Sequence, residues 1–222
     1  MLFVGLQFVI WSMSGAYMVV MDIHYIHGDS LVIKDTPSIN KEQVNYSINE
    51  LLTEYPEAKN VKLGLLLDQA VYRFSVTKQK MMISAYDGQR LADINVAAAI
   101  KIAKQHFADE NAEILATTLI TKQPSAELSA RHLPVWRVDF DDFASSSFYI
   151  SATNGELVTK RHNFWRIFDW MFVFHVMDYV DGSPENKLLL LVTVLALFGS
   201  VFGVVLTYFR LTPTQVNKRI KR

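Results

Sequence analysis

The sequence predicts an α+β protein in which two consecutive α-β-β-β repeats form an extracytoplasmic domain. Two transmembrane helices and one interfacial helix are expected to flank this domain. Residues 135–140 alternate apolar and polar side chains, which is the period of a half-buried strand. The stretches ISAYDGQRL (83–91) and ISATNGELV (150–158) match at Ile, Ser, Ala and Gly, which indicates an internal duplication. A charge-free run, Leu188–Phe209, is long enough to cross about 30 Å of hydrocarbon as a helix.

Composition excludes several functions. The 222 residues carry 22 basic and 22 acidic side chains, so nothing in the charge balance indicates nucleic-acid binding. The absence of cysteine excludes disulfides, thiolate catalysis and iron–sulfur ligation. The chain also has no nucleophile elbow, phosphate-binding glycine loop, zinc-protease motif or dinucleotide fingerprint. We therefore predict no catalytic residues and no metal site.

The first segment, 1–22, is apolar and lacks both a basic leading region and a small-residue cleavage site. It is interpreted as an uncleaved transmembrane helix, followed by a polar linker over 23–39.

The first repeat is expected over 40–92. Asn40 and Gln43 resemble a capping box for a helix that presents one apolar face. The strands that follow are predicted at 61–67, 71–76 and 81–85, and they close on the Asp87-Gly88 turn.

The second repeat is expected over 93–162. Asp93 or Asn95 caps its helix, and strands are predicted at 114–120, 135–140 and 148–152. Asn154-Gly155 predicts a type I′ turn into one more strand. The repeats differ mainly by a polar insertion, 121–133, which contains Arg131 and His132. Loops on rigid scaffolds often bind ligands, so these two residues form a candidate binding loop, and a tolerated surface excursion is the alternative.

The remaining segments are assigned to the membrane. Residues 163–180 are aromatic but include Arg166 and His175, which is typical of an interfacial helix, and 187–210 is the second transmembrane helix. Gly199 and Gly203 form a G-x-x-x-G face for packing against the first helix or for a homodimer. The tail, 211–222, is basic, which places it in the cytoplasm and the central domain in the periplasm of a bacterial inner membrane.

An aromatic-Arg strand, a polar bend and a strand that ends in Asp/Asn-Gly resemble a PepSY domain. The flanking stretches GLQFVIWSMSGAYM and RIFDWMFVFHVMDY resemble those of PepSY-associated transmembrane proteins of the iron-regulated type. The resemblance covers most of the chain. It implies a membrane-anchored protein that is not an enzyme on its own and whose periplasmic domain binds or regulates an unknown membrane or periplasmic partner.

The alternative is a haem-binding electron-transfer subunit. Some larger members of this family reduce ferric siderophores, so the chain would then be a component of a membrane ferric-siderophore reductase. His24 and His27 follow the first helix, and His175 lies on the interfacial helix. Neutral imidazole binds haem iron, so these three residues are candidate ligands for haem b. Histidines hydrogen-bonded to headgroups or water are the other interpretation.

Overall fold

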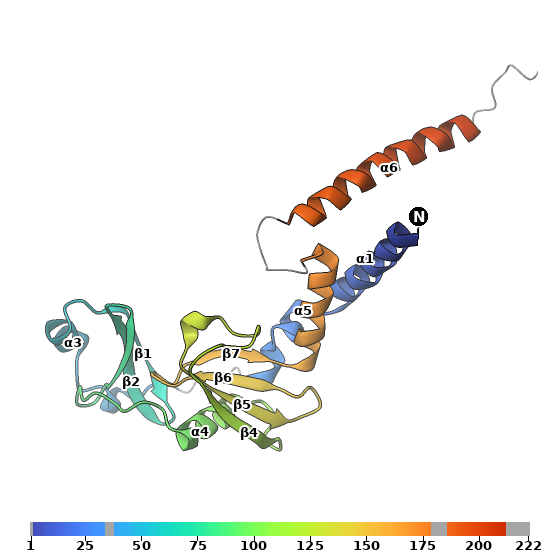
Figure 1. The fold of residues 1–222 in the computed structure, drawn as a ribbon. Coiled ribbons are helices and arrows are strands. Elements are labelled where there is room, and N and C mark those ends of the chain that lie inside the picture. Colours follow the sequence, from blue (N-terminus) through green and yellow to red (C-terminus); the bar gives the residue numbers. More distant parts are fainter. Residues whose placement is uncertain (1, 34–37, 179–185, 212–222) are drawn as a thin grey trace, which may run out of the picture. The chain divides into compact units, whose positions relative to one another are not determined.

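The computed structural model describes residues 2–33, 38–178 and 186–211 (Figure 1). The chain divides into two compact units. One unit is Met21–Ile167, here called the outer unit, and it contains both sheets. The other combines Met1–Val20 with Phe168–Arg222 and is here called the helical unit. An α+β architecture with two small antiparallel sheets is confirmed.

The outer unit begins with a short helix and a three-stranded sheet. Helix α3 (Ile48–Glu54) precedes β1 (Lys59–Leu66), β2 (Gln69–Val76) and β3 (Gln79–Ser84), which pair in chain order. The buried side chain of Leu51 on α3 packs against apolar side chains on one face of this sheet: Ala70, Tyr72, Phe74 and Ile83.

The predicted cap of this first helix is wrong. Asn40 caps only a short 3-10 turn, Lys41–Gln43, by accepting a hydrogen bond from the Glu42 amide. The true capping box is formed by Ser47 and Glu50, each of which bonds the backbone amide of the other. The S-x-x-E pattern was present in the sequence, but the apolar Val44 suggested an earlier start.

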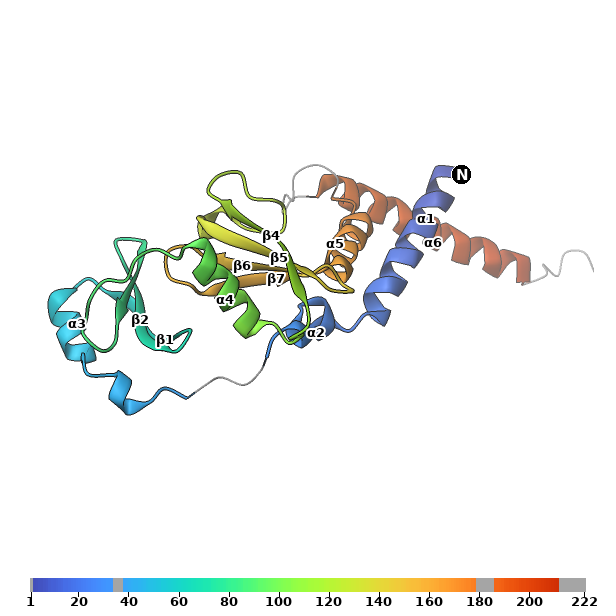
Figure 2. The same ribbon diagram turned by 90° about the horizontal axis from the view of Figure 1, so that it is seen from below.

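The second sheet has four strands and its own helix. Helix α4 (Val96–His106) precedes β4 (Glu113–Ile120), β5 (Val135–Asp141), β6 (Ser147–Ser151) and β7 (Leu157–Arg161), again paired in chain order. Asn95 caps α4 through the Ala98 amide, which confirms one of the two predicted caps. Helix α4 lies across one face of this sheet, in contact with β4, β5 and β6 (Figure 2).

The two sheets pair their strands in the same register. Val71 lies opposite Ser84 and Tyr72 opposite Ile83 in the first sheet. In the second, Val135 lies opposite Ser151 and Trp136 opposite Ile150. These pairs align the segment 71–76 with 135–140 and the segment 83–91 with 150–158.

The two Gly-containing turns also share one geometry, and it differs from the predicted type I′ turn. Gly88 N–H donates to Ser84 O, and Gly155 N–H donates to Ser151 O. Positive φ occurs only at the glycines, 72° at Gly88 and 66° at Gly155, and not at the preceding Asp or Asn. A type I′ turn needs positive φ at both central residues, so each connection is instead a four-residue loop that ends in a left-handed glycine.

The main core lies between the two sheets. Val71 and Met82 from the first sheet pack with α4 and with Val138 and Phe148 of the second. Arg73 crosses between the sheets, because its Nε donates to Asn154 O at 2.8 Å. The order of layers in the outer unit is therefore α3, first sheet, α4, second sheet.

The expected linker is partly folded onto the outer unit. Helix α2 (Ile23–Ile26) begins at the N-cap Asp22 and buries Ile26, and a 3-10 turn, Asp29–Leu31, follows. Val32 forms an isolated bridge with Phe107 at the end of α4. The segment packs because its apolar residues reach the main core, which local polarity did not indicate.

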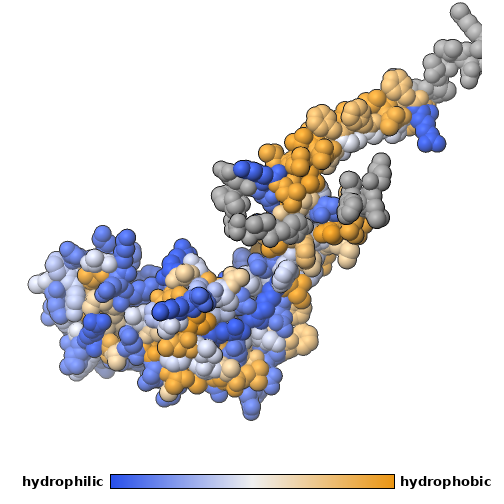
Figure 3. Space-filling view, in the orientation of Figure 1, coloured by the Kyte–Doolittle hydropathy of each residue, from blue (hydrophilic) through white to orange (hydrophobic). Residues whose placement is uncertain are grey.

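The helical unit contains α1 (Leu2–Val20), the second part of α5 (Asn163–Val176) and α6 (Lys187–Leu211). Trp11 Nε1 on α1 donates to His175 O on α5 at 2.6 Å. Within the described residues, only α6 is long and apolar enough to cross a membrane, by length and composition alone, and the apolar stretch 5–20 of α1 is shorter. The visible face of α6 is hydrophobic along its length (Figure 3).

Candidate functional site

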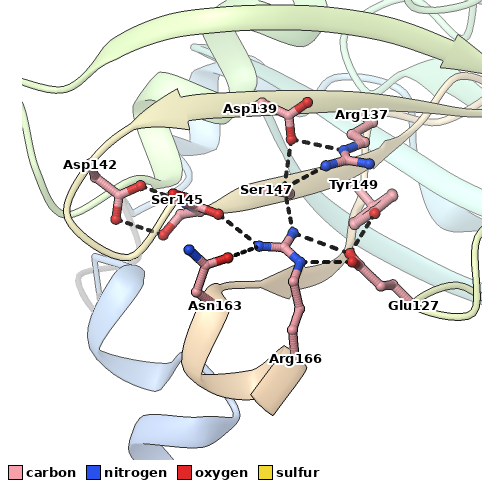
Figure 4. A network of polar contacts seen from close by, with 10 residues as sticks. Glu127, Arg137, Asp139, Asp142, Ser145, Ser147, Tyr149, Asn163 and Arg166 are labelled. Atoms are coloured by element: carbon pink, nitrogen blue, oxygen red, sulfur yellow. Dashed lines mark hydrogen bonds and ion pairs between the residues drawn. The ribbon is translucent and has the colours of Figure 1, made fainter. Parts of the chain in front are cut away.

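The second sheet has a polar outer face, opposite the face that α4 covers. Arg137, Asp139, Ser147 and Tyr149 project onto it because they alternate along β5 and β6 with the core residues. The loop 121–133, here called the insertion loop, and the start of α5 meet these side chains in one hydrogen-bonded network (Figure 4).

Arg166 is the centre of this network. Its Nε and one terminal nitrogen donate to the two carboxylate oxygens of Glu127 at 2.8 and 3.3 Å. The same terminal nitrogen donates to Ser147 Oγ at 2.9 Å. The other terminal nitrogen donates to Ser145 O at 2.9 Å and to Asn163 Oδ1 at 3.0 Å. All five N–H groups of the guanidinium are therefore used, which fixes the first turn of α5 to the sheet.

Glu127 fixes the insertion loop to the same place. Tyr149 Oη donates to its carboxylate at 2.8 Å. Burial alone would raise the pKa of Glu127, but the hydrogen bonds and positive charge of Arg166 and the hydrogen bond of Tyr149 together lower it. The neighbouring Leu128 is buried with Val135 and Tyr149. A carboxylate and a leucine thus hold the middle of the loop against the sheet.

A second arginine completes the charge balance of the face. Arg137 Nε donates to Asp139 Oδ1 at 2.8 Å, and Ser147 Oγ donates to the same oxygen at 2.6 Å. Burial would lower the pKa of Arg137, yet its hydrogen bond with Asp139 raises it. Ser147 Oγ, which donates to Asp139, also accepts hydrogen bonds from Arg137 and Arg166 and so serves as a bridge between the two arginines. We interpret the network as a scaffold that positions the insertion loop.

The predicted loop residues Arg131 and His132 lie together on a short 3-10 turn, Ala130–His132, and Arg131 Nε donates to His132 Nε2 at 3.0 Å. The pKa of His132 is lowered by burial and by the positive charges of Arg131 and Lys80. Lys80 belongs to β3, so the first sheet adds a cation to the loop. Sequence reasoning missed Lys80 because it lies in the other sheet.

The insertion loop follows directly from an edge strand. Among the described residues, the only strand that pairs with β4 is β5. Leu115 and Leu119 of β4 are 65% and 43% exposed, and Glu113 is the only charged residue of the strand. An edge strand of the first sheet, β1, differs because it carries Lys59 and Lys62. Natural edge strands usually carry lysine or proline, which discourages pairing with another chain.

The candidate haem ligands fall in both units. His24 lies on helix α2, and its Nδ1 is 3.2 Å from Oδ2 of Asp29, which follows the helix. His27 is the C-cap of α2. His175 belongs to the helical unit, where its Nδ1 lies 3.1 Å from Ser14 Oγ. A haem shared between His24 or His27 and His175 stays a prediction, and a Soret band that His175→Ala removes would be its signature.

His162 is a buried histidine whose role the sequence did not reveal. Its side chain is only 1% exposed. Its Nε2 lies 2.9 Å from Tyr25 O and 3.2 Å from Ile26 O, so this nitrogen carries the proton and donates to both carbonyls. Its Nδ1 is buried and has no hydrogen-bond partner among the residues that the structure describes. Burial lowers the pKa of His162.

Within residues 2–33, 38–178 and 186–211, no group of three His, Asp or Glu side chains is placed to hold a metal ion. Apart from the adjacent backbone of α6 itself, a Cβ added at Gly199 or Gly203 would meet no atom of the described residues within 4 Å. Their role in helix packing stays a prediction. The basic tail, 211–222, lies almost wholly outside the described residues.

We compared the chain with models of protein families, with curated proteins and with solved structures, and none of them matches it.

Proposed function

We propose that the chain is a membrane-anchored protein whose outer unit is a tandem PepSY-like duplication that binds an extended segment of a partner protein. The duplication is supported by the equal strand register of the two sheets and by the equal hydrogen bonding at Gly88 and Gly155. It is also supported by a helix before each sheet that covers the corresponding face.

Membrane anchoring is supported by α6. Its 25 residues give a helix about 37 Å long, which exceeds the hydrocarbon thickness of about 30 Å. Arg210 stands in its last turn, and the tail beyond is basic in sequence. This bias favours a cytoplasmic tail and a periplasmic outer unit, with α1 as the second membrane helix.

The open edge of β4 carries the binding proposal. The outward N–H and C=O groups of an edge strand can pair with an extended peptide, and alternate side chains then set its specificity. On β4 these groups are flanked by the exposed Leu115 and Leu119 rather than by lysines. The insertion loop begins where β4 ends, and Glu127 anchors its middle over the outer face of the sheet through Tyr149 of β6 and Arg166 of α5. Arg131 and Lys80 add positive charge, so we expect the bound segment to be apolar with acidic residues next to the loop.

Photo-crosslinking in native membranes tests this proposal. A benzophenone amino acid at Leu119 should form an adduct with the partner, whereas the same amino acid at Leu63 should not. Leu63 is a matched control because it lies on an edge strand of the first sheet, β1, and is 42% exposed compared with 43% for Leu119. Leu115→Lys should abolish the Leu119 adduct by adding a charge to the edge, and Lys62→Ala should have no effect on it. Equal adducts from Leu119 and Leu63, or an adduct that survives Leu115→Lys, would refute strand addition at β4.

A further inference from the structure

The bend between β5 and β6 presents an exposed aromatic side chain. Phe143 is 92% exposed, the most exposed of the large hydrophobic residues in the described part of the chain. The bend is nevertheless well ordered by Asp142, whose carboxylate accepts hydrogen bonds from the Ala144 amide at 3.2 Å and the Ser146 amide at 2.5 Å. The Asp142 side chain is therefore turned into the bend (Figure 4). The next side chain, Phe143, is left exposed.

Phe143 continues an aromatic group on the same rim of the outer unit. Its ring centroid lies 6.1 Å from that of Phe164 at the start of α5. The Phe164 ring lies 5.5 Å from Tyr25 on α2. The Asn163 amide donates to Ala144 O at 2.8 Å, so the bend and the start of α5 are tied by a backbone hydrogen bond.

This rim lies where the chain leaves the outer unit. The chain passes to the helical unit after Ile167, three residues beyond Phe164, and enters from it at Met21, four residues before Tyr25. Both chain connections therefore lie within four residues of the rim. Aromatic side chains favour the interface between headgroups and hydrocarbon.

We propose that the rim formed by Tyr25, Phe143 and Phe164 docks on the lipid bilayer, with the Phe143 ring inserted at the level of the headgroups. The inference rests on the proposed membrane anchoring. It adds a second attachment through the outer unit itself, which would hold the β4 edge at a fixed height above the membrane. The occupant is the lipid surface because the exposed group is apolar and lies within a few residues of both chain connections.

The natural absence of cysteine makes the test direct. Single-cysteine variants Phe143→Cys, Tyr86→Cys and Val201→Cys of the full chain are labelled with a nitrobenzoxadiazole dye and reconstituted in phosphatidylcholine vesicles. Tyr86 is a matched water-exposed control, since it is an exposed aromatic residue, 58% accessible, in the first sheet's glycine turn. Val201 lies in α6 and reports on membrane anchoring itself.

The dye at position 143 should emit at shorter wavelength than the dye at position 86, and iodide in the water should quench it less. A nitroxide at the headgroup should quench it more than a nitroxide deep in the acyl chain. The dye at Val201 should be quenched most by the deep nitroxide. If Val201 is in lipid but Phe143 behaves like Tyr86, the rim does not dock and anchoring stands. If Val201 is exposed to iodide, both the docking and the anchoring are refuted. Circular dichroism of each variant confirms that the fold is retained.

Discussion

Removal of the Arg166 side chain should destabilise the outer unit more than removal of any exposed arginine. Arg166→Ala leaves the carboxylate of Glu127 without its cation, and the side chains of Glu127 and Arg166 are only 16% and 24% exposed. It also removes hydrogen bonds to Ser147, to Ser145 and to Asn163.

The size of the effect follows from the partial burial of the pair. Breaking a fully buried ion pair costs about 3–5 kcal/mol, whereas an exposed pair contributes about 0.2–1 kcal/mol. The Arg166–Glu127 pair is largely buried and bidentate, so we expect a loss of about 3 kcal/mol in the free energy of unfolding. With a urea dependence of about 2 kcal/mol per molar, the midpoint should fall by about 1.5 M.

Pulse proteolysis of the full chain in mild detergent and urea measures this midpoint for the outer unit. Arg166→Lys should recover only part of the loss, because an ammonium group cannot match the bidentate contact with Glu127. Arg131→Ala is the matched control, since Arg131 is exposed and its side chain donates to the neighbouring His132. Its midpoint should stay close to that of the natural protein. Similar midpoints for Arg166→Ala and Arg131→Ala would refute the role assigned to the network.

Acid should reduce the difference between the natural protein and Arg166→Ala. The pKa of Glu127 is lowered in the folded state, so its contribution to stability is present above the ordinary pKa of 4.5 and is lost as pH falls through the folded value. The gap between the two midpoints should therefore shrink below about pH 4. A gap that is constant from pH 7 to pH 3 would contradict the ionic character of the contact.

Two further predictions concern the core of the outer unit. Burial lowers the pKa of His162 in the folded state, so as pH falls the unfolded chain takes up this proton before the folded chain does. Stability should therefore fall as pH drops below 6.5. His162→Asn should flatten this dependence between pH 7.5 and 5.5 in pulse proteolysis, and an unchanged pH profile would contradict the prediction. Leu51 is fully buried, so Leu51→Ala should lower the free energy of unfolding by about 2–5 kcal/mol. Leu52 is 42% exposed, so Leu52→Ala should lower it by less than about 1 kcal/mol. Equal midpoints for the two variants would show that α3 does not pack as described.

Local patterns predicted the regular elements well. Six of the seven described strands were located to within about two residues, because alternation along a strand and turn residues at its ends are properties of neighbouring positions. The seventh, β7, was predicted without bounds, as one more strand after the Asn154-Gly155 turn. The Asn95 cap of α4 was found for the same reason. The cap of α3 was misplaced because two S/N-x-x-E/Q patterns, 40–43 and 47–50, lie close together in sequence, and only packing of Leu51 on the sheet selects Ser47. The type I′ turn was wrong because Asn-Gly also suits a longer loop in which only Gly155 needs positive φ.

The sequence by itself determined the α+β class, the order of strands, the apolar helix at 187–211 and the insertion loop, since each depends on residues close together in the chain. Only the tertiary structure decided which polar residues meet. Arg166, Glu127 and Tyr149 come from three separate segments, and their contact depends on α5 docking on the outer face of the second sheet. The burial of His162 and the open edge of β4 were decided in the same way. Long-range pairing leaves no periodic signal in a sequence, because it depends on how finished elements pack and not on neighbouring residues.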